Sequence, residues 1–351
     1  MDTIKIAFFD TKPYDKEIFN IVNKKFTFEI KYHKYHLTQE TVVLAKGFNT
    51  VCIFVNDEVN KEVIGELFKS GVKLIALRCA GYNNVDFKAA YKKIHVVRVP
   101  AYSPFAVAEH TVALMLSLNR KIHRAYFRTR DANFSLHGLM GFDMHKKTAG
   151  IIGTGKIGKV LIDILLGFGM KVLGYDLYKD SALKNKPGFE YVDLDTLFSL
   201  SDIISLNCPL TKETEYIINS SSLSKMKDGV MLINTGRGKL IRTSDLVEAL
   251  KNGKVSAAGL DVYEEESDYF FEDHSDLVLT DDVLARLLTF NNVIITSHQA
   301  FFTQEAMQNI AQTTLQNISD FYGGKTLQNE ICYNCHLGSE NCQKKAIGKC
   351  F

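Results

Sequence analysis

A glycine-rich turn near the middle of the chain constrains the fold more than any other feature. The apolar run AGIIG, typical of a buried strand, leads into GTGKIG at 153–158, and a helical pattern follows up to Gly169. The next strand-like run, KVLGYD, ends at Asp176. A β-α-β unit with G-x-G-x-x-G at its first turn and an acidic residue after its second strand is the fingerprint of a doubly wound, dinucleotide-binding domain. The glycine pattern alone is weak, but this complete setting makes it specific.

Each part of this turn has a physical task. The first glycine permits a tight turn, the second lets the backbone approach a pyrophosphate, and the third allows close helix–strand packing. Asp176 can accept hydrogen bonds from both ribose hydroxyls and repels a 2′-phosphate, so NAD is predicted rather than NADP, and nearby Lys179 is the one residue that could weaken this preference. The alternative is a glycine-rich turn followed by a surface aspartate. The residues predicted to contact NAD here are Gly153, Thr154, Gly155, Lys156, Ile157, Gly158 and Asp176.

Strand-like and helical segments alternate on both sides of the turn, which predicts an α/β protein with two doubly wound parallel-sheet, Rossmann-like domains. The expected strands are 4–9, 50–55, 74–78, 96–99, 202–206, 230–234, 255–260 and 293–296. A long buried helix is expected to begin at Pro104, after Ser103 as N-cap, and the helical pattern at 302–322 is expected to return to the first domain. The predicted parts are a discontinuous substrate domain, 1–101 with 299–335, an NAD-binding domain, 102–298, and a flexible cysteine-containing tail, 336–351.

Charge and hydropathy argue against two classes of partner. The 42 basic and 40 acidic residues are scattered along the chain, so nothing favours nucleic acid or an anionic membrane surface. No apolar run approaches the ~18 residues that cross a bilayer. The N-terminus lacks the pattern of a signal peptide. We therefore expect a cytoplasmic protein with no nucleic-acid or membrane partner.

Three predicted strand ends carry the residue types that reduction of a keto acid requires. Arg237 follows one strand, three glutamates at 264–266 follow another, and His298 follows a third. Arginine binds two oxygens with its planar fork, and histidine beside a carboxylate supplies a proton. Ligands of open α/β sheets bind at the carboxyl ends of strands, so the three segments are expected to converge. His110 and His123, on the long helix, are interpreted as surface or satisfied core residues.

The chain resembles the D-isomer-specific 2-hydroxyacid dehydrogenase family, and within it the fermentative D-lactate dehydrogenases of bacteria. The similarity runs from the N-terminus to about Asn329 and rests on RCAGYNNVD, VRVPAYSP, AEHTVALMLSLNRKIHRAY, GIIGTGKIG, NCPLT, INTGRGKLI, GLDVYEEE and HQAF. The resemblance implies reversible hydride transfer from NADH to a small 2-keto acid, with pyruvate the first candidate, giving the D-2-hydroxy acid. It also implies a homodimer or a homotetramer.

The resemblance further implies roles for particular residues. Arg237 would bind the keto-acid carboxylate and carbonyl, and His298 would donate the proton. Glu266 would be the partner of His298, because the family places that glutamate five residues after the aspartate of the GLDVYEEE motif, and Glu264 and Glu265 are the alternatives. The other residues implied at the substrate are Phe54, Ala80, Gly81, Tyr102 and Phe301. The other residues implied at NAD are Cys208, Pro209, Thr235, Gly236 and Asp261.

The last twenty residues depart from the family pattern. Cys332-x-x-Cys335-His336, followed by Cys342 and Cys350, superficially matches c-type haem attachment or a zinc site. Haem attachment needs an exported chain, and the later spacings are irregular for zinc. We therefore expect no metal and a tail with exposed thiols.

Two other functions compete with D-lactate formation. The first is another dehydrogenase of the family, acting on phosphoglycerate, glyoxylate or formate. No room for a regulatory domain is expected after Tyr322, and formate oxidation needs no proton donor to an oxygen. The second is a redox-sensing binding protein like the corepressors that resemble these enzymes, which would need a partner-binding groove or extension.

Overall fold

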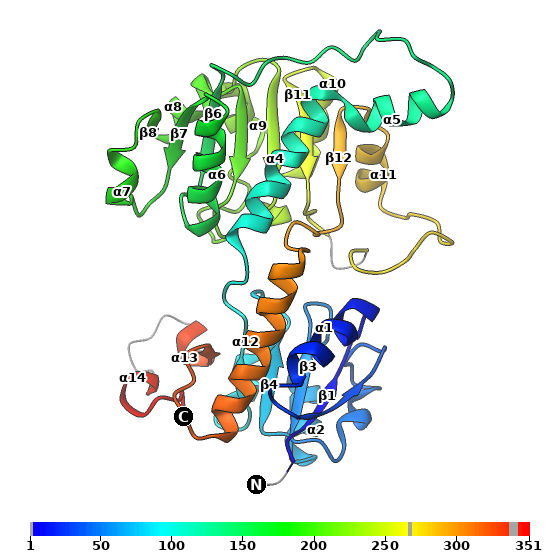
Figure 1. Cartoon of the computed structure of the whole chain (residues 1–351), viewed down its shortest axis with the longest axis vertical. Coiled ribbons are helices and arrows are strands. Elements are labelled where there is room, and N and C mark those ends of the chain that lie inside the picture. Colours follow the sequence, from blue (N-terminus) through cyan, green and yellow to red (C-terminus); the bar gives the residue numbers. More distant parts are fainter. Residues whose placement is uncertain (1–2, 266–268, 337–342) are drawn as a thin grey trace. The chain divides into compact units, whose positions relative to one another are not determined.

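The chain forms two compact units in a computed structural model that describes residues 3–265, 269–336 and 343–351 (Figure 1). Unit 1 comprises Met1–Ser103 and Thr303–Phe351, and unit 2 comprises Pro104–Phe302. Each unit is built on a sheet of parallel strands, with one antiparallel edge strand in unit 1, and helices pack on the sheet. The predicted fold class, two doubly wound α/β units, is confirmed.

The sheet of unit 1 has six strands in the order β13-β5-β4-β3-β1-β2. Its strands are β1 (Lys5–Phe8), β2 (Glu29–Tyr32), β3 (Thr50–Ile53), β4 (Leu74–Leu77), β5 (His95–Val97) and β13 (Glu330–Ile331). The first five pair in parallel, and β13 pairs antiparallel with β5. Strand order reverses between β1 and β3, and every residue of the neighbouring β3 and β4 is buried, as expected for strands covered on both faces.

The helices of unit 1 come from both ends of the sequence. They are α1 (Pro13–Asn23), the 3₁₀ turn η1 (Val42–Ala45), α2 (Lys61–Lys69), α3 (Phe87–Ala90), α12 (Gln304–Tyr322), α13 (Tyr333–His336) and α14 (Lys344–Ile347). Helix α12 packs on α1 and β4, so the chain returns to the first unit after completing the second. The Thr303 side chain caps α12 by accepting a hydrogen bond from the Ala306 backbone at 3.2 Å.

Unit 2 has a fully parallel seven-stranded sheet in the order β12-β11-β10-β9-β6-β7-β8. The strands are β6 (Thr148–Ile152), β7 (Lys171–Tyr175), β8 (Phe189–Tyr191), β9 (Ile203–Leu206), β10 (Val230–Asn234), β11 (Val255–Leu260) and β12 (Val293–Ile295). The chain moves outward from β6 to β8 and then back to β9 on the other side of β6. A crevice for a ligand is expected outside the carboxyl ends of strands at this reversal.

Two hydrophobic cores cover the two faces of this sheet. The helical elements are α4 (Pro104–Arg120), α5 (Ile122–Arg130), α6 (Lys156–Gly167), α7 (Ser181–Lys184), α8 (Leu194–Leu200), α9 (Ser220–Lys225), η2 (Gly238–Leu240), α10 (Thr243–Lys251) and α11 (Asp282–Leu288). Along β10, Met231 belongs to the core with α4 and α6, which lie side by side, and Leu232 belongs to the core with α9 and α10 (Figure 1). This alternation is the period of a strand buried on both faces.

Helix α4 begins at Pro104, as predicted, and runs to Arg120. Three strands were missed in the sequence analysis. β2 has alternating exposed and half-buried residues at an edge of its sheet, β8 is three residues long and also lies at an edge, and β13 has only two residues. Short or polar edge strands carry too little apolar pattern to be recognised.

The described part of the cysteine-containing tail also differs from the expectation. Cys332 and Cys350 are buried, with 3% and 1% of their surface exposed, so the expectation of exposed thiols is wrong for these two residues. Cys335 is half-buried, and Cys342 lies outside the described residues. The tail therefore packs against the protein at two of its cysteines.

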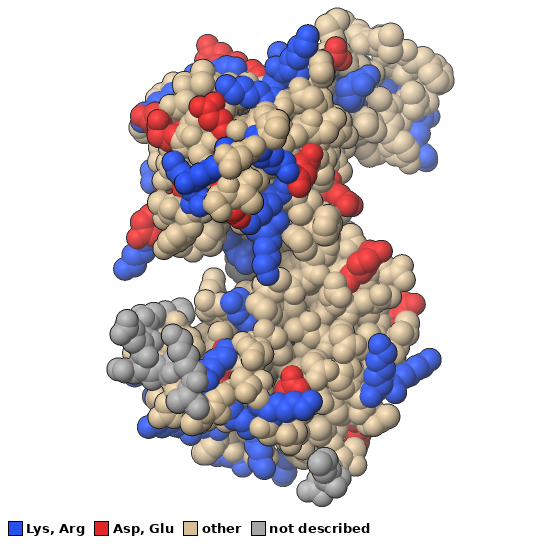
Figure 2. Space-filling view, turned by 60° about the vertical axis from the view of Figure 1, so that its left-hand side comes forward, with Lys and Arg blue, Asp and Glu red and all other residues tan. Residues whose placement is uncertain are grey.

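The surface carries both signs of charge. Figure 2 shows Lys and Arg side chains interspersed with Asp and Glu side chains on one face, in keeping with 42 basic and 40 acidic residues. Among the helices of the described residues, none combines the length and the apolar character that a bilayer-spanning segment needs.

Candidate active site

The glycine turn after β6 is shaped by close packing. Gly153 has φ of +96°, where side chains are strained, and a Cβ atom there would lie 2.5 Å from the backbone nitrogen of Cys208. A Cβ atom on Gly158 would overlap the carbonyl oxygen of Gly153. At Gly155, directly before α6, a Cβ atom would meet no atom within 4 Å. Gly153 and Gly158 thus close the turn, and Gly155, the second glycine of the motif, leaves open space at the helix N-terminus, which fits a pyrophosphate.

Asp176 follows β7 and holds the turn in place. One carboxylate oxygen accepts hydrogen bonds from the Thr154 backbone at 2.7 Å and from its hydroxyl at 3.2 Å, and the other accepts from the Tyr178 backbone at 2.9 Å. The Tyr191 hydroxyl lies 2.9 Å from the Thr154 hydroxyl, within hydrogen-bond distance. The carboxylate is half-buried and keeps lone pairs that suit ribose hydroxyls.

Cys208 and Pro209 follow β9, across the strand-order reversal from the glycine turn. Burial raises the pKa of the Cys208 thiol to about 11, and the nearby Asp176 charge contributes to the rise. A thiol with a raised pKa is a weak nucleophile, so Cys208 suits an uncharged contact with a cofactor. Together with the turn and Asp176, this arrangement defines unit 2 as a dinucleotide-binding domain.

The buried Asp261, directly after β11, organises the segment that carries His298. Its side chain is fully buried. One carboxylate oxygen accepts hydrogen bonds from the Thr296 hydroxyl at 2.5 Å and the Gln299 backbone at 2.9 Å, and the other accepts from the Ala300 backbone at 2.8 Å. Its backbone carbonyl accepts from the His298 backbone at 2.7 Å. The segment 296–300 is therefore wrapped around one carboxylate.

His298 has an unusual backbone conformation in this segment. Its φ of +53° lies in the left-handed region, which a non-glycine residue occupies only when surrounding contacts hold it there. The imidazole is half-buried, and its ring centroid lies 5.8 Å from that of Phe271. The hydrogen bonds to Asp261 explain how this conformation is maintained.

His110, on α4, belongs to the same network. Its Nε2 lies 3.1 Å from the Thr296 hydroxyl and 3.4 Å from a carboxylate oxygen of Asp261. The expectation that His110 is a surface or satisfied core residue agrees with these contacts, but the sequence did not reveal that its partners are the two side chains that hold the His298 segment. The motif AEHTVALMLSLNRKIHRAY, which contains His110, is the available signal.

Arg237 follows β10, the strand next to β11. Its guanidinium Nη1 donates to the Gly236 carbonyl at 2.7 Å, and its own carbonyl accepts from the Asn234 side chain at 2.9 Å. The neighbouring Thr235 is buried, and its hydroxyl lies 2.9 Å from that of Thr111. Arg237 is half-buried on a fixed backbone, which suits a guanidinium that receives an anion.

The three consecutive glutamates after β11 differ in their surroundings. Glu264 accepts hydrogen bonds from the Tyr216 hydroxyl at 2.7 Å and the Thr243 backbone at 2.9 Å. The bond to Glu264 is the main cause that raises the pKa of Tyr216 to about 12. Glu265 is exposed, and Glu266 lies outside the described residues. Glu264 is thus occupied with structural contacts in unit 2.

The residues of unit 1 that were predicted to contact the substrate include Phe54, directly after β3, and two residues after β4. The Phe54 backbone donates to Asp57 at 2.6 Å and accepts from Asn84 at 2.9 Å, while the Arg78 guanidinium lies 4.7 Å from the Phe54 ring centroid. Burial raises the pKa of Asp57 to about 6, although the Arg78 charge and two backbone hydrogen bonds oppose the rise. The loop that carries Phe54 is therefore firmly held.

Four further predicted residues are placed by contacts within their own units. The Ala80 carbonyl accepts from Arg98 at 2.7 Å, and the Gly81 carbonyl accepts from the Cys79 thiol at 3.2 Å. The Tyr102 carbonyl accepts from the side chain of Asn309 at 2.8 Å. In unit 2, Phe301 packs on Phe302, with ring centroids 6.0 Å apart.

Comparisons with known proteins agree with these features. Residues 112–300 match the family model of the NAD-binding domain of D-isomer specific 2-hydroxyacid dehydrogenases. The D-lactate dehydrogenase of Escherichia coli K12 is 55% identical over 329 residues, which is 93% of this chain and 100% of the relative. The apo-structure of the E. coli enzyme matches with a TM-score of 0.87 at 52% identity, covering 93% of this chain and 100% of that one.

Two other solved structures extend the comparison. The pyruvate reductase of Chlamydomonas reinhardtii has a TM-score of 0.90 at 44% identity, covering 93% of this chain and 98% of that one. The NAD-complexed D-isomer specific 2-hydroxyacid dehydrogenase of Lactobacillus delbrueckii ssp. bulgaricus has a TM-score of 0.78 at 34% identity, covering 93% and 99%. The chain belongs to the D-isomer specific 2-hydroxyacid dehydrogenase family. It is an NAD-dependent oxidoreductase.

Alanine substitutions can separate the two tasks of the glycine turn. Gly155→Ala is expected to lower the free energy of unfolding by no more than ~1 kcal/mol, because the added methyl meets open space and the only cost is a poorer N-cap for α6. It should weaken NADH binding by at least about tenfold, or ~1.4 kcal/mol, since the methyl occupies the space where the pyrophosphate meets the backbone. NADH fluorescence titration and chemical denaturation measure the two effects.

Gly153→Ala is expected to lower the free energy of unfolding as well. Gly253→Ala is the matched control, because Gly253 also has positive φ, +80°, but a Cβ atom there meets no atom within 4 Å. The control should lose ~1–2 kcal/mol from the left-handed backbone alone. Gly153→Ala should lose clearly more, from the added overlap with Cys208, and equal losses would contradict the tight packing at that position.

Proposed function

We propose that the chain is an NAD-dependent D-lactate dehydrogenase that reduces pyruvate to D-lactate, and that the reaction is reversible. The observation that carries the proposal is the placement of Arg237, Asp261 and His298 at the ends of the adjacent strands β10, β11 and β12. The names of the E. coli and Chlamydomonas relatives support the choice of pyruvate and D-lactate.

The proposed roles follow from the chemistry of the side chains. Bound NADH supplies the hydride. Arg237 binds the carboxylate and polarises the carbonyl of the keto acid with its planar guanidinium. His298 donates the proton to the carbonyl oxygen during reduction and accepts it during oxidation. Glu266 is the carboxylate partner that orients His298.

Asp261 and His110 act in this proposal as positioning residues. The fully buried carboxylate of Asp261 fixes segment 296–300, and His110 contacts both that carboxylate and Thr296. Such support keeps a proton donor within the narrow range of positions that proton transfer requires. Asp261 is therefore proposed to support catalysis by positioning His298, beside its predicted role at NAD.

Unit 1 supplies most of the remaining proposed contacts and is the substrate domain of the proposal. The backbone N–H groups of Ala80 and Gly81 bind the substrate carboxylate, and Tyr102 lies at the substrate. Phe54 is a proposed contact of the small side chain of the substrate, and Phe301 of unit 2 is the other proposed contact of that side chain. Support comes from the fixed backbone of the Phe54 loop. The homodimer or homotetramer and the cytoplasmic location stay predictions.

A direct assay tests the proposed substrate. Purified protein with NADH should reduce pyruvate, and chiral analysis should find D-lactate. If bulky phenylalanine rings contact the substrate side chain as proposed, kcat/KM should be higher for pyruvate than for 2-keto acids with branched side chains. Hydroxypyruvate, glyoxylate and oxidation of formate with NAD serve as comparisons, and a higher kcat/KM on any of these would assign a different dehydrogenase activity.

Replacement of the proposed proton donor tests the mechanism. His298→Gln should lower pyruvate reduction by roughly 10²–10⁴-fold, the usual contribution of a positioned acid, while NADH still binds. His137→Gln is the control, because His137 is exposed in unit 2. In the unmodified protein, reduction should fall at alkaline pH and lactate oxidation should rise, since one direction consumes the proton and the other needs the neutral base. Unchanged reduction in His298→Gln would remove this residue from the mechanism.

A pair of glutamate variants identifies the partner of His298. Glu266→Gln should lower kcat and move the alkaline limb of the reduction profile to lower pH, because a neutral amide no longer stabilises the imidazolium. Glu264→Gln should lower the thermal stability, because it disturbs the contacts with Tyr216 and Thr243, and leave the alkaline limb in place. If the alkaline limb moves in Glu264→Gln and stays in place in Glu266→Gln, Glu264 is the partner of His298.

A further inference from the structure

The described part of the C-terminal segment is tied closely to unit 1. β13 pairs with β5, and the side chain of Glu330 accepts a hydrogen bond from the Cys350 backbone at 2.5 Å. The ring of Phe351 stacks on His95, with centroids 4.3 Å apart. Residues 332 and 350, eighteen positions apart in the sequence, therefore lie at one place on the unit.

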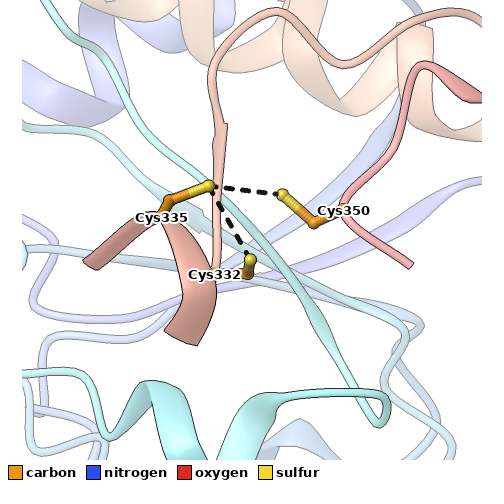
Figure 3. A group of neighbouring side chains, drawn as sticks. All are labelled: Cys332, Cys335 and Cys350. Atoms are coloured by element: carbon orange, nitrogen blue, oxygen red, sulfur yellow. Dashed lines mark hydrogen bonds between the residues drawn. The ribbon is translucent and has the colours of Figure 1, made fainter. Parts of the chain in front are cut away.

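Three cysteine sulfurs converge at this place. The Sγ atom of Cys335 lies 3.7 Å from that of Cys332 and 3.8 Å from that of Cys350, and all three sulfurs lie within 4.8 Å of one another. Figure 3 shows the Cys335 sulfur pointing toward both of the others. Cys332 is the single residue between β13 and α13, Cys335 lies in α13, and Cys350 lies in the segment after α14. The fold thus gathers thiols from three local structures.

The separations match the geometry of a thiolate metal centre. Zn–S bonds of ~2.3 Å at tetrahedral angles place neighbouring sulfurs ~3.8 Å apart. A disulfide between Cys335 and either of its neighbours would require ~2.05 Å between the sulfurs, far less than the 3.7 and 3.8 Å observed. The geometry points to one Zn²⁺ ion bound by the thiolates of Cys332, Cys335 and Cys350, and we propose this site as a structural feature of the chain.

The chemistry of the three residues favours zinc. Thiolates are soft ligands that prefer Zn²⁺ to Mg²⁺ or Ca²⁺, and three of them occupy three corners of a tetrahedron. Binding would release the thiol protons and neutralise most of the charge at a place where two of the cysteines are buried. The ammonium group of Lys344 donates to the carbonyls of Gln328 and Glu330, which brings a positive charge to the adjoining strand.

The irregular spacing of the cysteines in the sequence predicts no zinc, whereas their positions in the fold favour it. The spacing between Cys335 and Cys350 is irregular for a small zinc module that folds around its metal. Here β13, the Cys350–Glu330 hydrogen bond and Phe351 already place the distant cysteine. An ion at this place would join the last residues of the chain to the edge of the unit 1 sheet and stabilise the folded state.

Metal analysis of the full chain tests the proposal. The protein is purified without a histidine tag or chelator, and its zinc content is measured by inductively coupled plasma mass spectrometry. One zinc per chain is expected. Metal-depleted protein refilled with Co²⁺ should show the near-ultraviolet thiolate-to-cobalt absorption and the visible bands of tetrahedral cobalt. Protein that neither retains zinc nor takes up cobalt with these bands would overturn the proposal.

Single substitutions assign the ligands. Cys335→Ser and Cys350→Ser should each lose the zinc and the cobalt spectrum and should lower the melting temperature. Cys52→Ala is the control, because Cys52 is a buried thiol of β3 in the same unit and should keep a full complement of zinc. In both cysteine-to-serine variants, the rate of pyruvate reduction should stay within a few-fold of that of the unmodified protein. The test of the zinc site is therefore separate from the test of the proposed function. Unchanged zinc in Cys335→Ser, or a native Cys332–Cys335 disulfide found by mass spectrometry, would contradict the site.

Discussion

The proposed catalytic arrangement depends on the hydrogen bonds that the buried carboxylate of Asp261 accepts from segment 296–300. A fully buried carboxylate is unfavourable unless hydrogen bonds replace its lost water, and here the Thr296 hydroxyl and the Gln299 and Ala300 backbones do so. Because all three donors belong to one segment, satisfying the charge also fixes that segment. The left-handed backbone of His298 is stable only in such a frame.

The loops that carry Arg237 and Asp261 are interlocked by backbone packing. A Cβ atom on Gly238, directly after Arg237, would overlap the carbonyl of Tyr263, two residues after Asp261. The Tyr263 hydroxyl in turn donates to Asp281 at the start of α11, at 2.7 Å. The arginine and the segment around the aspartate therefore cannot shift independently. The paired strands β10 and β11 fix the distance between the two loops, and Gly238 permits the contact between them.

Much of the fold and of the dinucleotide site could be predicted because local sequence determines them. The turn at 153–158 needs glycine at particular positions, and its setting between a strand and a helix is visible as hydropathy. Contacts between distant residues could not be predicted in this way. His110 and Thr296 meet only because α4 crosses the sheet, and β13 is a strand only because β5 offers it an edge.

The cysteine cluster is another case in which contacts between distant residues could not be predicted from local sequence. A spacing rule recognises a metal site when a short segment folds around the ion, so that the ligands' separation in the sequence reflects their separation in space. Cys332 and Cys335 satisfy such a rule as a C-x-x-C pair. Cys350 reaches them through contacts of its backbone with Glu330 and of its neighbour Phe351 with His95. Its position depends on the sheet edge of unit 1, and a motif confined to the tail cannot contain that information.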